Sequence, residues 1–325
     1  MKVRIIAELC QNHLGDRSIL RRMVDAAADA GATHVKIQHI YTDNLVYRPQ
    51  FETGLKVSGV EHCIHRPFKP EYDRLKPLEL DDEIVRDFVA YARQRKVVPM
   101  TTCFARRDIE TILKQGFSSI KVASYDCASY TLLRELAANF EELVISTGAT
   151  FDDEIKMAAK VVADHQNISF LHCVTLYPTP LDQMHLNRMI WLKRFCSSVG
   201  LSDHSLVSQD GVMASKVAIA MGASLIERHF TILDVDKTKD GPVSIRPDDI
   251  VDLVRFGALP QGDQLSELDS LRPGWSSELG GVANRSLSDQ ELLNRDYYRG
   301  RFASPREIGK HEASRMVFNW EETPI

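Results

Sequence analysis

Eight short apolar runs, each followed by a segment with helical spacing, are the feature that most restricts how this chain can fold. Each run is about six residues long and nearly continuous in apolar character, as expected of a strand covered on both faces. Eight β/α units predict a (β/α)8 TIM barrel. A doubly wound open sheet is the alternative, and no GxGxxG motif follows the first run to support it. The runs span residues 3–9, 34–40, 97–103, 119–125, 143–148, 168–174, 198–204 and 225–230.

The segments between the runs carry signals for the ends of helices. Asp16 is placed to cap a helix, and Gly31 follows it where a C-terminal glycine is common. Thr150 and Asp153 predict a start of the capping-box type for a second helix. Further helices are expected over residues 82–95, 107–114, 131–138, 185–194, 212–221 and 246–257.

Two regions depart from the alternation. Residues 41–79 form a long insertion after the second run, and loops at that end of a barrel often cover the active site. Several prolines and glycines after the last β/α unit mark a linker. We therefore expect a catalytic barrel over residues 1–257, and a linker with a short irregular C-terminal extension over residues 258–325.

Charge and hydropathy exclude two classes of partner. The formal net charge is −5, from 40 Lys+Arg against 45 Asp+Glu, so no basic excess is available for nucleic acid. No apolar run approaches the length of a membrane span, and the N-terminus lacks the pattern of a signal peptide. None of the six cysteines forms a CxxC pair. We expect a cytoplasmic protein with reduced, mostly buried cysteines.

Polar residues collect at the ends of the runs, where the active site of a barrel lies. Such residues need partners, because burying an unpaired polar group costs roughly 1–3 kcal/mol. Those in question are Glu8, Lys36, Gln38, Thr102, Lys121, Ser124, Asp126, Ser146, Tyr177, Ser202, His204, Glu227 and His229.

Two of these residues, Lys36 and Lys121, are lysines in runs of buried character. A single buried lysine could be a Schiff-base nucleophile or part of a structural network with Glu8 and Asp126. Two lysines accompanied by several hydroxyl groups favour a clamp for a dianion, because lysines supply charge and hydroxyls supply donors.

Two histidines, His204 and His229, end the last two runs. Each histidine alone is as readily a structural residue. As a pair on neighbouring strand ends, they predict a site for one divalent metal. Two protein ligands leave positions open for water or substrate, which suits Lewis-acid activation of a carbonyl group.

Several segments resemble the sialic acid synthase family. The opening reads AELCQNHLG at 7–15, AGA at 30–32 and VKIQ at 35–38. Later segments similar to that family are KVAS at 121–124, STG at 146–148, LHCV at 171–174, YPTP at 177–180, GLSDH at 200–204 and IERHFT at 226–231. They occur in the family's order over about residues 3–256, a span that fits the expected barrel.

The resemblance implies a transferase that condenses phosphoenolpyruvate with a hexosamine-type aldose. The product would be a nonulosonic, sialic-acid-like 2-keto-3-deoxy acid, and the enzyme would be a homodimer. The metal would be a divalent ion, usually manganese, with magnesium or cobalt as alternatives. Catalytic roles would fall to Glu8, Lys36, Lys121, His204 and His229, the last two being metal ligands. Substrate contacts would come from Gln38, Thr102, Ser124, Asp126, Ser146, Tyr177 and Ser202.

Two departures from the family pattern concern the acceptor sugar. Val243 stands where family members often carry an aspartate that touches the acceptor. The C-terminal region is too short for the antifreeze-like domain that lends an arginine to the partner's site. In its absence Arg295, Arg299 and Arg301 are the nearest candidates for that cation.

Two other functions remain open at this point. A related synthase that makes an octulosonate or heptulosonate would need a second phosphate site, and no further basic cluster stands at a strand end. A non-catalytic sugar- or anion-binding barrel would be favoured by the loss of a metal histidine or a clamp lysine. Neither kind of residue is lost.

Overall fold

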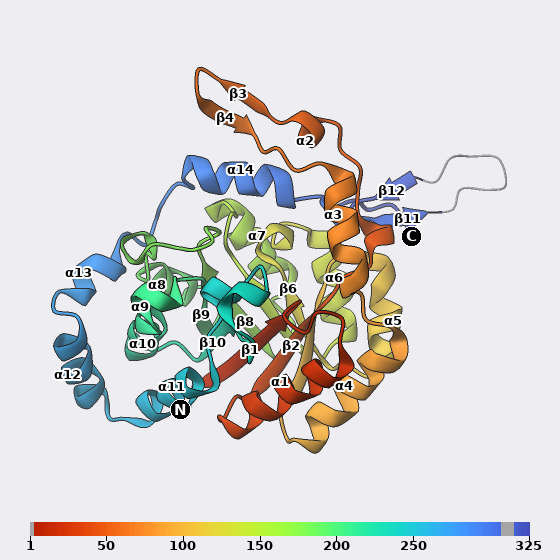
Figure 1. Cartoon of the computed structure of the whole chain (residues 1–325). Helices are drawn as coiled ribbons and strands as arrows, with labels where there is room; N and C mark the ends of the chain where they lie inside the picture. The colour runs from red at the N-terminus through yellow and green to blue at the C-terminus, as the bar shows by residue number, and fades with distance from the viewer. Residues whose placement is uncertain (1–2, 307–314) are drawn as a thin grey trace.

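The computed structural model describes residues 3–306 and 315–325, which form a closed barrel of eight parallel strands with helices around it (Figure 1). The strands pair in the order β1-β10-β9-β8-β7-β6-β5-β2. Every predicted run contributes one strand, so the TIM barrel is confirmed and the open sheet is excluded. The strands are β1 Arg4–Cys10, β2 His34–His39, β5 Val98–Cys103, β6 Ser119–Val122, β7 Glu142–Ser146, β8 Ile168–Cys173, β9 Val199–Asp203 and β10 Leu225–His229.

The helices between the strands follow the predicted spacing. Asp16 caps the first one, because its side chain accepts hydrogen bonds from the backbone N–H groups of Ser18 and Ile19. The helices are α1 Arg17–Asp29, α4 Asp82–Gln94, α5 Ile109–Lys114, α6 Tyr130–Asn139, α7 Asp152–Val161, α8 Arg188–Leu192, α9 Val207–Asp210, α10 Met213–Ala220 and α11 Pro247–Ala258.

The predicted role of Thr150 at the start of α7 is wrong. The cap position belongs to Phe151, whose backbone N–H donates to the Glu154 carboxylate. The Thr150 hydroxyl instead donates to the carbonyl oxygens of Ser124 and Gly148. It therefore ties together two loops at the end of the barrel where the site lies.

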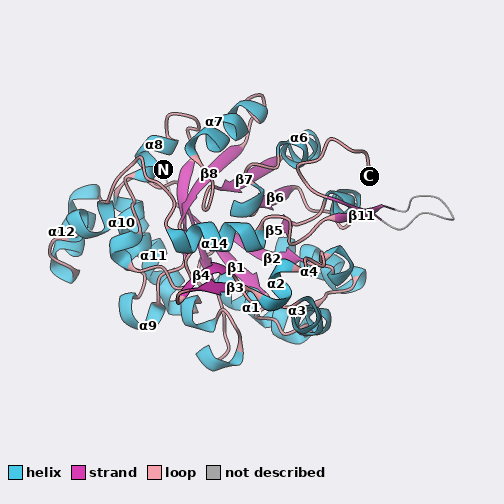
Figure 2. Cartoon of the chain, turned by 90° about the horizontal axis from the view of Figure 1, so that it is seen from above, coloured by secondary structure: helices cyan, strands magenta, loops and turns pink. Residues whose placement is uncertain are grey.

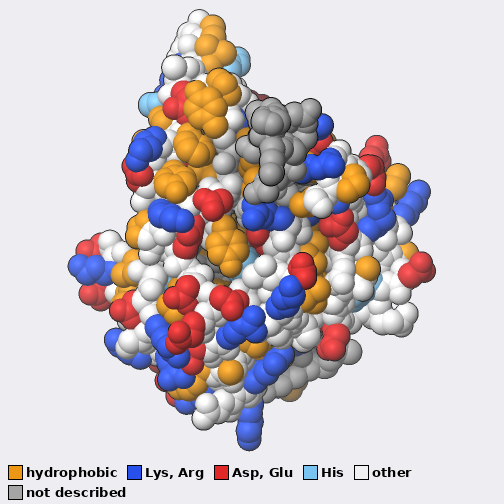
Figure 3. All heavy atoms as spheres, turned by 90° about the vertical axis from the view of Figure 1, so that its right-hand side faces the viewer, with side chains coloured by type: hydrophobic (Ala, Val, Ile, Leu, Met, Phe, Trp, Pro, Cys, Tyr) orange, Lys and Arg blue, Asp and Glu red, His pale blue; other side chains and the backbone are white. Residues whose placement is uncertain are grey.

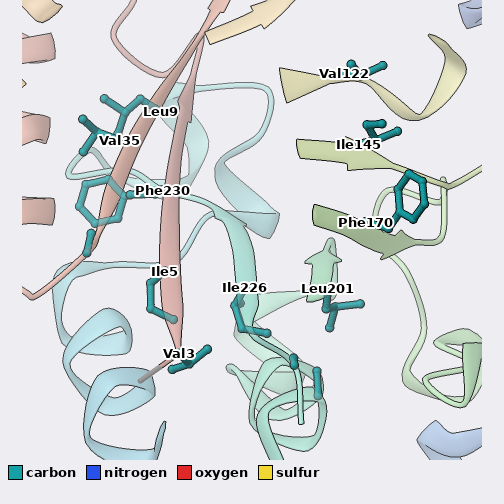
Figure 4. Close-up of a cluster of buried hydrophobic side chains, with 14 of the residues drawn as sticks. Val3, Ile5, Leu9, Val35, Val122, Ile145, Phe170, Leu201, Ile226 and Phe230 are labelled. Atoms are coloured by element: carbon teal, nitrogen blue, oxygen red, sulfur yellow. The ribbon is translucent and has the colours of Figure 1, made fainter. Parts of the chain in front are cut away.

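The strands separate an outer hydrophobic layer from an inner one. Outward-facing side chains pack against the helices, and Figure 4 shows part of this layer. Inside the barrel, five apolar side chains form a plug. Because side chains alternate along a strand, the residues two positions further on also point inward, at the upper end of the barrel. The plug consists of Ile6, Met100, Val144, Leu171 and Leu225, and the residues two positions further are Glu8, Thr102, Ser146, Cys173 and Glu227.

A polar network closes the lower end of the barrel around Glu142. Its carboxylate pairs with Arg4 and accepts a hydrogen bond of 2.6 Å from the Ser119 hydroxyl. His34 Nε2 lies 3.2 Å from the same carboxylate. Burial alone would raise the pKa of Glu142, but His34, Ser119 and Arg4 together lower it from 4.5 to about 2.

We expect Glu142→Gln to destabilise the fold in a pH-dependent way. The folded-state pKa lies below the unfolded one, so the carboxylate contributes its stability above about pH 4.5 and loses it as the pH falls towards 2. The shift corresponds to roughly 3 kcal/mol at pH 7. Urea unfolding at pH 7, 5 and 4 measures the gap between wild type and variant. A gap that stays constant with pH, or one equal to that of the exposed control Glu141→Gln, would contradict this account.

The insertion and the later part of the C-terminal extension lie at the upper end of the barrel, whereas the first two helices of the extension lie at its side, next to α10. The insertion contains α2 Gln50–Thr53, α3 Phe68–Leu75 and a hairpin of β3 Leu55–Val57 and β4 Val60–Cys63. Figure 3 shows hydrophobic side chains on the part that projects furthest. The extension is more regular than expected, and its helix α14 lies across the barrel end in both views (Figures 1 and 2). It comprises α12 Gln261–Leu271, α13 Trp275–Gly280, α14 Asp289–Tyr298, β11 Ser304–Arg306 and β12 Arg315–Val317.

None of the helices in the described residues combines the length and the hydropathy needed to cross a bilayer.

Candidate active site

An inner cavity of about 160 Å³ opens at the carboxyl ends of the strands. The structure brings every predicted site residue together on its walls. The loop after β6, together with Tyr298, Gly300, Arg301 and Phe302 of the extension, completes the lining. The predicted residues on the walls are Glu8, Lys36, Gln38, Thr102, Lys121, Ser124, Asp126, Ser146, Tyr177, Ser202, His204 and His229.

Lys36 lies at the centre of a buried network of charges. Its ammonium group pairs with Glu8 and lies 3.2 Å from Glu227, and it donates to the Thr102 hydroxyl. Burial alone would lower the pKa of Lys36, but Glu227 and Glu8 raise it above its ordinary value. A buried Lys–Glu network therefore exists, but its carboxylates are those of Glu8 and Glu227 and not that of Asp126. It coexists with the cavity, because the same groups form the cavity wall.

Lys121 is less completely neutralised than Lys36. It donates to the Ser146 hydroxyl at 2.7 Å and to the Val122 carbonyl, whereas its nearest carboxylate, Glu227, lies 3.9 Å away. Burial lowers the pKa of the Lys121 ammonium, an effect that Glu227 opposes and the charge of Lys36 adds to. A buried cation in this state favours an anionic ligand beside it.

The hydroxyl groups differ in what they can still donate. Those of Thr102 and Ser146 accept from the two lysines, which leaves each O–H free to donate to an anion. Ser202 instead donates its own proton to Glu227 at 2.7 Å. Asp126 takes no part in the lysine network, because its carboxylate accepts from Ser129 and Asn319.

Glu227, which the sequence pattern places at a strand end but to which no role was assigned, is central to the site. It faces both lysines and Ser202 from β10, and Lys121 and Lys36 hold its pKa well below the usual range although burial alone would raise it. The available signal was its spacing, because Glu227 lies two residues before His229 and so points to the same side of the strand.

The two predicted metal ligands lie side by side, with the ring centroids of His204 and His229 5.4 Å apart. A tighter donor set also includes His229. The ligand atoms of Cys10, His229 and Asp240 all lie within 4.8 Å of one another, and the Cys10 sulfur is 3.3 Å from Asp240. His229 Nδ1 is buried without a hydrogen-bond partner in the described residues.

These donors fit a divalent metal. Imidazole, thiolate and carboxylate are all ligands of transition metals, and burial with the proximity of His229 lowers the pKa of His204 to about 3, so that its ring is neutral. Cys10 follows Glu8 across a β-bulge, so its sequence predicts only a small buried hydrophobe, whereas the structure places its sulfur beside Asp240. Asp240 comes from a loop whose position no local pattern indicates.

Behind the histidines, a fully buried ion pair joins β9 to β10. Arg228 lies 2.6 Å from Asp203, and both side chains are 0% exposed. Asp203 also accepts from Ser215 and from the backbone N–H of Ser205, and Arg228 donates to the Ser205 hydroxyl. Each member of the pair directly precedes one histidine in sequence, so the pair fixes the two strand ends that carry His204 and His229.

We expect Arg228→Leu to lower the free energy of unfolding by about 3–5 kcal/mol, because it leaves Asp203 charged and buried without a partner. Denaturant unfolding at pH 7 gives the value. The double variant Asp203→Asn, Arg228→Leu should lose much less than the sum of the two single variants, because no buried charge remains. Additive losses would show that the pair is not coupled.

Two expectations about the acceptor need correction. Val243 is buried, lines neither cavity, and offers its carbonyl oxygen to Arg228. Asp240, from the same loop, faces a cavity instead, namely a larger outer one. Of the three candidate arginines in the extension, Arg301 alone lines the cavities, whereas Arg295 and Arg299 pair with Glu154 of α7.

Comparison with known proteins identifies the family. Residues 23–258 match the sequence profile of the NeuB family. The chain belongs to the NeuB family. It is 30% identical to the N,N'-diacetyllegionaminic acid synthase of Campylobacter jejuni over 257 residues, covering 77% of this chain and 73% of the relative. It is also 30% identical to a pseudaminic acid synthase of Campylobacter jejuni over 314 residues, covering 94% and 86%.

A solved structure of the same kind supports the fold of this NeuB family member. The N-acetylneuraminic acid synthetase of Leptospira borgpetersenii, solved in complex with citrate, superimposes with a TM-score of 0.65 at 26% identity, covering 83% of this chain and 91% of that one. Synthases of this family form a carbon–carbon bond with phosphoenolpyruvate as donor, so the predicted resemblance and enzyme class are confirmed.

Proposed function

We propose that this protein condenses phosphoenolpyruvate with a hexosamine-type aldose to give a nonulosonic 2-keto-3-deoxy acid and phosphate. The observation that carries the proposal is the shared cavity. Two buried lysines with hydroxyl donors and the histidine pair line the same cavity, and the thiol of Cys10 and the carboxylate of Asp240 lie beside His229. One site can therefore hold an anionic donor next to a carbonyl acceptor.

In this proposal Lys36 and Lys121 hold the phosphate and carboxylate of phosphoenolpyruvate, and Thr102 and Ser146 donate their free O–H groups to it. Ser124 contributes a further hydroxyl to this wall. Ser202 acts indirectly, because it fixes the Glu227 carboxylate between the lysines. Two preorganised cations then stabilise the negative charge that develops on the departing phosphate. Stabilisation of this kind is usually the largest contribution to lowering the activation free energy.

The bond changes follow from the chemistry of an enol phosphate. Its methylene carbon attacks the aldehyde carbon of the acceptor, so that the C=O π bond opens and the aldehyde oxygen takes up a proton to become a hydroxyl. Water adds at the neighbouring carbon, which has become electron-poor. Glu8 is placed to take the proton from this water, because its carboxylate already faces Lys36 at the cavity wall. The tetrahedral intermediate loses phosphate through carbon–oxygen cleavage, which leaves the keto group.

His204, His229, Cys10 and Asp240 are the residues that would hold a divalent metal, which we propose to be manganese. When bound, such an ion polarises the aldehyde oxygen. Gln38, Asp126 and Tyr177 complete the acceptor side of the cavity. We further propose that the protein acts as a homodimer in the cytoplasm.

Carbon–oxygen cleavage provides the direct test. With phosphoenolpyruvate labelled with ¹⁸O in the bridging oxygen and a panel of N-acetylhexosamines, the label should leave with inorganic phosphate, and the keto acid should be detected by mass spectrometry. Retention of the label in the keto acid would overturn the mechanism. Absence of phosphate release with every aldose would overturn the function and favour a non-catalytic barrel.

A further inference from the structure

A second, outer cavity of about 890 Å³ continues from the inner one. The lining residues that the two cavities share are Gln38, Tyr125, Tyr177, His229, Tyr298 and Arg301. An acceptor whose aldehyde reaches His229 would therefore extend its other end into the outer cavity. The walls of the outer cavity decide which group that end can carry.

Four cations from separate segments line this outer cavity: Arg66, Arg74, Lys239 and Arg301. Arg66 follows β4, Arg74 lies in α3, Lys239 lies in the loop after β10, and Arg301 follows α14. Figure 1 shows α3 and the end of α14 at the same side of the barrel mouth. The cluster is absent from the strand ends, which explains why the sequence analysis found no second anion site.

The ring of Tyr298 brings two of these cations together. The guanidinium carbons of Arg66 and Arg301 lie 5.3 and 5.5 Å from its centroid. The hydroxyl of the same tyrosine accepts a hydrogen bond from Arg66. The cations thus converge on one wall.

Carboxylates neutralise this cluster only in part. Glu71 pairs with Arg74 and with Arg301. In the described parts of the chain, no ion pair to a carboxylate is formed by Arg66 or by Lys239. The Nε atom of Arg301 is buried without a hydrogen-bond partner in those parts. A buried donor of this kind on a cationic wall favours an anionic ligand.

Two carboxylates on the outer cavity do not remove this excess. Asp240 belongs to the donor set around His229. Asp289 begins α14, whose other end is Tyr298, so it lies roughly 14 Å along the helix from the cationic wall. The excess positive charge therefore stays near Arg66, Lys239 and Arg301.

We infer that the acceptor sugar carries a phosphate monoester at the end remote from its aldehyde, and that Arg66, Lys239 and Arg301 bind that phosphate. This inference rests on the proposed function for the place of the aldehyde, and it adds the substrate class. The arginines match the oxygens of a phosphate in geometry, and the lysine adds a point charge.

Binding and turnover test the inference separately. The first measurement is calorimetric titration of N-acetylmannosamine 6-phosphate and N-acetylglucosamine 6-phosphate, and of the two unphosphorylated sugars, onto the full-length protein. We expect the phosphorylated forms to bind about tenfold or more tightly. In Arg66→Ala, Lys239→Ala that advantage should disappear. The control Lys237→Ala removes an exposed lysine of the same loop and should keep it.

The second measurement is phosphate release from phosphoenolpyruvate with the same four sugars. The phosphorylated acceptor should be favoured about tenfold or more in kcat/KM. The double variant should lose this preference, whereas the control Lys237→Ala should keep it. Equal or better use of the unphosphorylated sugars would overturn the inference and leave the proposed function intact.

The remaining outcomes separate the two claims. If no sugar releases phosphate but the phosphorylated ones still bind through Arg66 and Lys239, the proposed function fails and the anion site stands. If phosphorylated sugars bind equally well to the double variant, they occupy the inner lysine clamp, and the outer site is refuted.

Discussion

Replacing His229 with alanine is expected to lower kcat/KM about 100-fold or more, equivalent to roughly 3 kcal/mol of lost transition-state stabilisation. His229 belongs both to the predicted histidine pair and to the Cys10–Asp240 donor set, so its loss removes a ligand in either arrangement. The measurement is steady-state kinetics after chelation, with and without added manganese. Binding of manganese by each protein gives a second readout.

Matched variants test which of these side chains act as metal ligands. His62→Ala removes an exposed histidine of β4 and should leave both activity and manganese binding unchanged. Comparing His204→Ala with Cys10→Ala separates the histidine pair from the donor set that contains the thiol. If the His204→Ala, His229→Ala double variant keeps full activity in chelator, no metal acts at this site.

Lys121→Ala is expected to lower kcat/KM for phosphoenolpyruvate by about 100- to 1,000-fold, because a preorganised cation at the departing phosphate is lost. The KM of the acceptor should change far less, since Lys121 lines the inner cavity and does not line the outer one. The initial rates, measured with each substrate varied in turn, give both constants.

Two further variants test whether the loss of activity comes from the charge of Lys121 rather than from a change in packing. Lys121→Met keeps most of the side-chain volume, so an equal loss in that variant shows that the charge matters rather than the packing. Lys160→Ala removes an exposed lysine of α7 and should have no effect. A Lys121→Met enzyme with wild-type kcat/KM would remove Lys121 from the clamp.

The barrel and most of its polar lining could be predicted because both depend on local periodicity. A strand covered on both faces reads as an apolar run, and its inward-facing end is marked by a polar residue such as Lys36 or Ser146. The same rule, applied at spacing two, places Glu227 beside His229, but a single carboxylate has no evident role without its neighbours. Cys10 could not be placed in this way, because a β-bulge interrupts the alternation between Glu8 and Cys10.

The cations that line the outer cavity could not be predicted in this way. Arg66, Lys239 and Arg301 are far apart in the sequence and come from loops and from the extension, so tertiary packing alone brings them together. The error about Val243 has the same origin. Its neighbour Asp240 lines the outer cavity because of how the loop after β10 folds back, and no local pattern records that path.

The wall formed by residues 298–302 has a consequence for the order in which the enzyme becomes functional during its synthesis. The last barrel helix ends at Ala258, so all eight strands leave the ribosome well before Tyr298 and Arg301 do. In the nascent barrel, the lysines and histidines of the cavity are therefore exposed to solvent. Enclosure of a substrate, and with it protection of reactive intermediates from hydrolysis, begins only once residues 298–302 have been added.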